Sequence, residues 1–160
     1  MGLEQALAFT LKEEGGFVDD PKDHGGATCR GVTQRTYDTY RDRMRLPRRT
    51  VAEIDPDESR DIYTSMYWNP GHCRELPARL GVCHFDWCVN HGVIGALRML
   101  QQVLGTAASP KDDETWKTYN KLRRDWYRAR VKSYPDQGVF LSGWLARVDR
   151  LDAYIEGLAR

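Results

Sequence analysis

Two acidic residues and a threonine near the start of the chain have the side chains that general acid–base chemistry needs. Hydrolysis of a glycosidic bond takes a protonated carboxyl beside the leaving oxygen and a second group that activates water or stabilises the sugar cation. Glu14 precedes Gly15 and Gly16, and we expect partial desolvation there to favour the protonated form of its carboxyl. Asp23 lies in a wetter, glycine-rich stretch that favours the ionised form, and Thr28 carries a hydroxyl able to hold a water. These three side chains therefore predict a general acid at Glu14, a general base at Asp23 and a water-holding hydroxyl at Thr28.

The segments around these residues predict a helix followed by a loop with a small hairpin. Leu3, Ala6, Leu7 and Leu11 recur at helical spacing, and the pattern stops at the double glycine. Residues 17–33 are rich in Asp, Pro and Gly, as in a presented loop. A glutamate at a helix end and aspartates in turns also occur for conformational reasons alone, so this spacing leaves a structural role open.

Helical patterns dominate the rest of the chain. They cover residues 34–43, 56–68, 76–90, 92–104, a helix opened at Ser109-Pro110 that carries Trp116 to Val131, and 140–155. The 160 residues, 41% hydrophobic and 29% charged, are typical of one globular domain. No stretch is long and apolar enough for a membrane span, and the N-terminus has no signal-peptide pattern, so we expect synthesis in the cytoplasm. We also expect a monomer whose four cysteines are free thiols.

The loop region carries a resemblance to a known family. The run from Glu14 to Thr33, EGGFVDDPKDHGGATCRGVT, resembles the signature of glycoside hydrolase family 108, in which Glu-Gly-Gly is followed by Asp-Pro, Gly-Gly-x-Thr and Gly-Ile-Thr. Later segments resemble further blocks of the same family, the last of them from its C-terminal peptidoglycan-associated region: YWNP at 67–70, LP at 76–77, FDWCVNHG at 85–92 and FLSGWLARV at 140–148.

This resemblance implies a mainly α, lysozyme-like α+β fold: a helical bundle with one small β-hairpin near the N-terminus. It implies a muramidase that hydrolyses the β-1,4 bond between N-acetylmuramic acid and N-acetylglucosamine in peptidoglycan, with Glu14 as the acid and no cofactor. Members of this kind are phage endolysins and bacterial secretion-activator-like lysozymes, and we expect an endolysin that acts on the periplasmic cell wall. Residues 1–92 are expected to form the catalytic region, with 93–160 packed on it as one compact domain.

Tyr67 and Asn90 are candidates for substrate contact. A tyrosine ring stacks on a sugar face, and an asparagine amide pairs with an N-acetyl group. Both have a structural alternative, because Tyr67 lies in an aromatic-rich helix and Asn90 lies on an otherwise apolar one.

A metal site is the competing chemistry. His84, Cys88 and His91 fall on one helix face with spacing that suits zinc, as in a metallopeptidase. Three ligands on one straight helix close a tetrahedron poorly, and no glutamate base lies among them. We therefore expect no metal in the reaction.

Two basic runs suggest a second partner besides peptidoglycan. Residues 41–49 hold one run. The other follows the C-terminal helical pattern and consists of Lys117, Lys121, Arg123, Arg124, Arg128, Arg130 and Lys132. Such runs are usually solvated faces, and the net charge of +1 gives no support for a nucleic-acid partner. Attraction of the second run to an anionic outer-membrane surface is the functional alternative. A peptidoglycan-binding or secretion-helper protein without turnover is the second function that the sequence leaves open.

Overall fold

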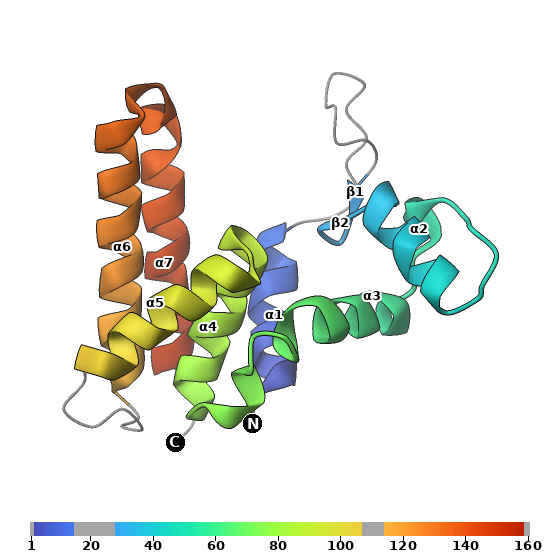
Figure 1. The fold of residues 1–160 in the computed structure, drawn as a ribbon, viewed down its shortest axis with the longest axis horizontal. Helices are drawn as coiled ribbons and strands as arrows, with labels where there is room; N and C mark the ends of the chain where they lie inside the picture. Colours follow the sequence, from blue (N-terminus) through green and yellow to red (C-terminus); the bar gives the residue numbers. More distant parts are fainter. Residues whose placement is uncertain (1, 15–27, 107–113, 159–160) are drawn as a thin grey trace.

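The computed structural model describes residues 2–14, 28–106 and 114–158 (Figure 1). These parts hold seven α-helices and one two-stranded antiparallel hairpin, in which Thr28 pairs with Thr33 and Cys29 with Val32. The helices and strands are α1 Leu3–Glu14, β1 Thr28–Cys29, β2 Val32–Thr33, α2 Gln34–Arg43, α3 Pro56–Tyr63, α4 Ala78–His91, α5 Val93–Thr106, α6 Thr115–Ser133 and α7 Leu141–Glu156. Four shorter helical segments are η1 Val51–Glu53, η2 Thr64–Trp68, η3 Cys73–Glu75 and η4 Pro135–Phe140.

Helix α4 forms the centre of the core. It packs against α1, α5, α6 and α7, and every residue from Arg79 to Cys88 is buried. Such a helix must be apolar nearly all round, which explains why its sequence lacks a polar stripe. Of the polar residues in this run, His84 and Asp86 are fully buried and therefore need partners.

The hairpin, α2 and α3 form a smaller part of the molecule on the far side of α1 from the α6–α7 pair (Figure 1). Local signals in the sequence begin these helices. Thr33 caps α2, and Asp55 with Glu58 forms a capping box at the start of α3.

The expected fold class, mainly α with one small hairpin, is confirmed. The prediction of one regular helix over 56–68 was wrong in its second half. Helix α3 ends at Tyr63, and the chain continues as the π-helical segment η2. The four cysteines are free, as expected. Among the described residues, no helix is both long and apolar enough to cross a membrane.

Candidate active site

Glu14 is the last residue of α1, and its carboxylate is held by an arginine from the other end of the chain. Arg147 of α7 places its Nη2 atom 2.8 Å from Glu14 Oε1. The Glu14 side chain remains 24% exposed, so the group is fixed by a charged partner yet accessible. An ion pair between groups this far apart in sequence forms only when α1 and α7 pack together.

Arg147 is itself held by a buried carboxylate. Its Nη2 atom lies 2.8 Å from Asp86 Oδ1, and Asp86 also accepts a 2.8 Å hydrogen bond from Arg123 of α6 and a longer one from Thr10 of α1. Burial alone raises the pKa of Asp86, but the charges of Arg123 and Arg147 outweigh it and the net shift is downward. Asp86 is therefore ionised, and it fixes the guanidinium that contacts Glu14.

These groups form a chain of alternating charge that we call the Glu14 network, consisting of Glu14, Arg147, Asp86 and Arg123. Its members come from α1, α7, α4 and α6. Two acids and two bases cancel, which is the condition under which charged groups are tolerated in a core. The position of Glu14 is thus set by the packing of four helices rather than by its own turn.

The hairpin turn lies directly over Glu14. Gly31 has a φ of +73°, and a Cβ atom at that position would lie 2.7 Å from Glu14 Cβ and 2.3 Å from the Tyr63 hydroxyl oxygen. The Tyr63 hydroxyl also donates a 2.9 Å hydrogen bond to the carbonyl of Arg30. Glycine is therefore required at the turn both for its backbone conformation and for the close approach.

Two tyrosines flank the acid. The rings of Tyr63 and Tyr67 lie 5.7 Å apart, the first buried and the second partly exposed. Burial, and then the negative charge of Glu14, raise the pKa of both phenols. Both tyrosines therefore keep their protons at neutral pH, so that Tyr67 is a hydrogen-bond donor near Glu14.

The other predicted site residues are Asp23, Thr28 and Asn90. Asp23 lies outside the described residues. Thr28 is on β1 in the hairpin, partly buried. Asn90 is exposed near the end of α4, accepts a 2.6 Å hydrogen bond from the Tyr127 hydroxyl, and lines a pocket of about 290 Å³.

This pocket is largely aromatic. Besides Asn90 it is lined by His91, Trp126, Tyr127, Arg130 and Trp144. Its wall is therefore built mainly from α4, α6 and α7, and it presents both ring faces and an amide.

Glu13 provides a contrast one residue earlier. It forms a two-point ion pair with the exposed Arg150, at 2.8 and 2.6 Å. The hydrogen bond from Arg150 lowers the pKa of Glu13, although burial opposes it. Glu13 is thus an arginine-paired carboxylate outside the Glu14 network.

Sequence reasoning missed Arg147, Asp86 and Arg123. It placed Arg123 on a solvated basic face, and this was wrong, because the side chain is fully buried against Asp86. One signal was available: an aspartate within an apolar helix must find a buried partner.

The helical body with its small hairpin has a lysozyme-like fold. The family model described as "Glycosyl hydrolase 108" matches residues 7–92, just over half of the sequence. The chain therefore belongs to the glycosyl hydrolase 108 family. Glu14, Gly31, Tyr63 and Asp86 lie inside the matched stretch, whereas Arg123 and Arg147 lie beyond it.

A solved structure supports the fold over the whole length. The structure titled "Structure of Brucella abortus SagA" is similar with a TM-score of 0.69 and 26% sequence identity, covering 99% of this chain and 95% of that chain. A search of curated proteins found no match.

Proposed function

We propose that this protein is a muramidase that hydrolyses the β-1,4 bond between N-acetylmuramic acid and N-acetylglucosamine in peptidoglycan, with Glu14 as the general acid. The observation that carries the proposal is the setting of Glu14. In a chain of a glycosyl hydrolase family, this one carboxylate is fixed by Arg147, covered by the Gly31 turn, and still partly exposed.

The geometry suggests how each group contributes. Arg147 engages Oε1 of Glu14, so we assign the transferable proton to Oε2. Tyr67, protonated and close to Glu14, is proposed to donate a hydrogen bond to the sugar. Asn90 is proposed to contact an N-acetyl group from its pocket, since its amide nitrogen remains a donor while its oxygen accepts from Tyr127.

The second catalytic group remains the sequence-based proposal of Asp23 with Thr28. In an inverting enzyme the two carboxyls stand roughly 6.5 to 9.5 Å apart with a water between them. We propose this arrangement for Glu14 and Asp23, which makes the product inverted. NMR of the first-formed anomer and the kinetics of Asp23→Asn test it: a retained anomer, or turnover close to wild type, contradicts the role of Asp23.

The main test compares Glu14→Gln with Glu13→Gln. Both changes remove the charge of a carboxylate paired with an arginine at the end of α1, but only the first removes the proposed proton donor. We expect Glu14→Gln to lose at least about a hundredfold in turnover, as is usual for loss of a general acid. Glu13→Gln should remain close to wild type.

The readout is release of muropeptides from purified peptidoglycan, with the reducing-end sugar identified by mass spectrometry. Reducing N-acetylmuramic acid identifies a muramidase. Equal activity of the two variants, at matched melting temperatures, would remove Glu14 from the mechanism.

One observation favours the second candidate, a protein that binds peptidoglycan without turnover. Glu14 is ion-paired with Arg147, and such a pair between two helices is what a purely structural carboxylate would form. Wild-type protein that sediments with peptidoglycan but releases no reducing ends would support this candidate. We assign the periplasmic cell wall as the place of action and a phage endolysin as the origin, both as parts of the proposal.

The proposed attraction to an anionic envelope now depends on fewer side chains. Arg123 is buried, and Arg124 is held by Asp149 and Asp152 of α7. Four side chains of the run remain exposed on α6: Lys117, Lys121, Arg128 and Lys132. Changing Lys117 and Lys121 to glutamine should weaken binding to vesicles with anionic lipid while leaving hydrolysis of purified peptidoglycan unchanged.

A further inference from the structure

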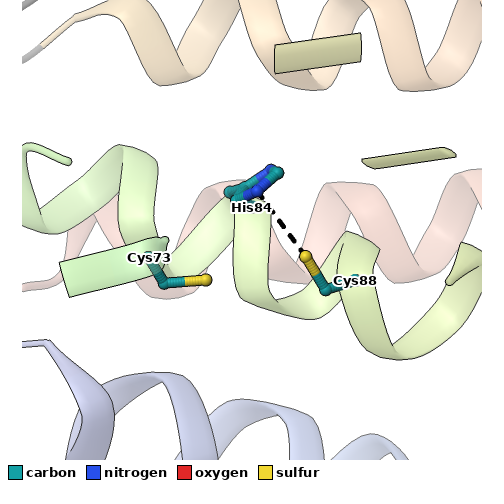
Figure 2. Close-up of side chains that lie close together, drawn as sticks. All are labelled: Cys73, His84 and Cys88. Carbon is teal, nitrogen blue, oxygen red and sulfur yellow. Dashed lines mark hydrogen bonds between the residues drawn. The ribbon is translucent and has the colours of Figure 1, made fainter. Parts of the chain in front are cut away.

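Three metal-ligating side chains meet in the core, away from solvent. Among the described residues, Cys73, His84 and Cys88 bring one ligand atom each to within 4.8 Å of one another, and all three residues are buried. Figure 2 shows the Cys73 sulfur turned toward Cys88 and the Cys88 sulfur turned toward the His84 ring. Cys73 comes from η3, whereas His84 and Cys88 are one turn apart on α4.

This set differs from the one that sequence spacing indicated. His91 is not a member, because its ring stacks on Trp87 with the centroids 4.5 Å apart. Cys73 takes that place from a different element. The objection to three ligands on one straight helix therefore does not apply.

The surroundings of the three ligands suit a metal ion. Cys88 Sγ lies 3.6 Å from His84 Nε2, close to the separation of two ligands on one tetrahedral zinc ion. The other ring nitrogen, Nδ1, lies 2.7 Å from the Tyr119 hydroxyl, as metal-bound histidines commonly have a fixed partner on the second nitrogen. The hydroxyl serves either tautomer because it both donates and accepts.

The backbone at Gly71 leaves room for the sulfurs. A Cβ atom there would lie 2.8 Å from Cys88 Sγ and 3.1 Å from Cys73 Sγ. The Gly71 carbonyl is 3.0 Å from His84 Nε2, which donates to it while no metal is bound. This oxygen is also a candidate for the fourth ligand, which the three side chains do not supply.

We propose that Cys73, His84 and Cys88 bind one zinc ion that fastens the 71–75 segment to α4. Two thiolates and a neutral imidazole are soft and borderline donors, which suit zinc. On binding, the two thiol protons are released to solvent, the histidine proton moves to Nδ1, and two Zn–S bonds and one Zn–N bond form. The two thiolate charges cancel the charge of the ion, so the core gains no net charge.

Burial makes the proposed site structural rather than catalytic. Zinc that activates water keeps an open position toward substrate, and these three residues are each no more than 1% exposed. Tyr67 connects the proposed zinc site to Glu14. Its carbonyl accepts a 2.9 Å hydrogen bond from the Gly71 amide, and the charge of Glu14 contributes to the raised pKa of its hydroxyl.

The experiment measures zinc bound by the full chain, purified without a histidine tag, kept reduced, loaded with zinc and desalted. We expect one equivalent in wild type. Cys73→Ser and Cys88→Ser should each lose stoichiometric binding. Cys83→Ala is the matched control, because Cys83 is a fully buried thiol on α4 outside the cluster, and it should keep one equivalent. Tyr119→Phe should bind roughly tenfold more weakly.

Two measurements on wild type keep the test independent of variant folding. Cobalt in place of zinc should give a sulfur-to-cobalt charge-transfer band, and zinc binding in weak buffer should release two protons per chain. Failure of the reduced wild-type protein to take up zinc or cobalt overturns the proposal, as does full binding by both serine variants. A Cys73–Cys88 disulfide in air-exposed protein, with no metal uptake after reduction, would identify a redox pair and likewise overturn it.

Discussion

Two buried carboxylates in this molecule are each neutralised by two arginines, but with different consequences. Asp86 belongs to the Glu14 network described above. Glu58 belongs to a second cluster, the Glu58 network, in which it contacts Arg41, Arg49 and the Tyr37 hydroxyl. The members of the Glu58 network lie between residues 37 and 58, so this cluster joins α2 to α3 locally.

The Glu14 network, in contrast, joins residues from 14 to 147 and ends at an accessible acid. The Glu58 side chain is only 11% exposed and accepts from four groups, the fourth being the Asp55 amide, whereas Glu14 is 24% exposed. The comparison shows that arginine–carboxylate pairs between residues close in sequence, as in the Glu58 network, leave little of the carboxylate exposed. In the Glu14 network the ion pairs extend to the surface, where the last carboxylate, Glu14, is accessible.

The largest expected effect on stability is at Asp86. Asp86→Ala leaves Arg123 fully buried and Arg147 mostly buried without their shared partner. Breaking a buried pair in this way costs about 3–5 kcal/mol of the free energy of unfolding. Urea unfolding measures it, and Asp86→Asn is the milder variant if the alanine protein does not fold. Asp149→Asn is the control, because Asp149 is the exposed member of a pair with Arg124 of α6, and it should cost at most about 1 kcal/mol.

Activity measurements on Asp86→Asn test the comparison between the two networks further. Asp86→Asn should reduce turnover as well as stability, because Arg147 loses the group that positions it on Glu14. Glu58→Gln should reduce stability alone. Activity that falls equally in both variants, measured well below their melting temperatures, would contradict a separate positioning role for the Glu14 network.

A smaller and more local effect is expected at Gly31. Gly31→Ala meets both the strain of a positive φ, about 1–2 kcal/mol, and a clash with Glu14 and Tyr63. Gly92 also has a positive φ, of +86°, but nothing lies within 4 Å of its missing Cβ, so Gly92→Ala isolates the backbone strain. We expect similar losses of stability from strain but a loss of turnover in Gly31→Ala only. Equal turnover in the two variants would show that the hairpin does not shape the site.

The smallest expected effect is the loss of stability at low pH. For Glu58, burial raises the pKa but hydrogen bonds from Tyr37 and Arg49 outweigh it, and for Asp86 the two arginines have the same net effect. Both folded-state pKa values lie below the unfolded values of about 4. Their stabilisation is therefore complete above that pH and is lost as pH falls through the lower folded values. Unfolding curves from pH 6 downward should show this loss, and it should be shallower in Glu58→Gln. An unchanged slope in that variant would contradict the contribution of Glu58.

Much of the fold follows from local patterns in the sequence. The periodic apolar residues of α1, the turn residues before Thr33 and the capping residues Asp55 and Glu58 each act on their own neighbours. Sequence spacing therefore predicted the helical body and the hairpin. It predicted one regular helix over 56–68, but no local signal marked the change to a π-helix after Tyr63.

The site was less predictable for the same physical reason. The Glu-Gly-Gly run pointed to Glu14, but its partner Arg147 is 133 positions away. Arginines such as Arg41 and Arg123 look alike in a basic run, and only tertiary packing decides which are buried. His91 and Cys73 show this too, since ligand geometry is fixed by the contact of η3 with α4 and not by spacing along one helix.

The order of the Glu14 network along the chain has a consequence for synthesis. A ribosome delivers the acid among the first residues and both arginines that neutralise Asp86 only after residue 122. Until then, closing α4 into a core would bury a lone carboxylate, at a cost of several kcal/mol. A nascent or truncated chain that ends after the family-matched stretch therefore has a reason to stay open. The core can close only once α6 and α7 have been synthesised. Their arginines neutralise Asp86, and Arg147 also brings Glu14 into position.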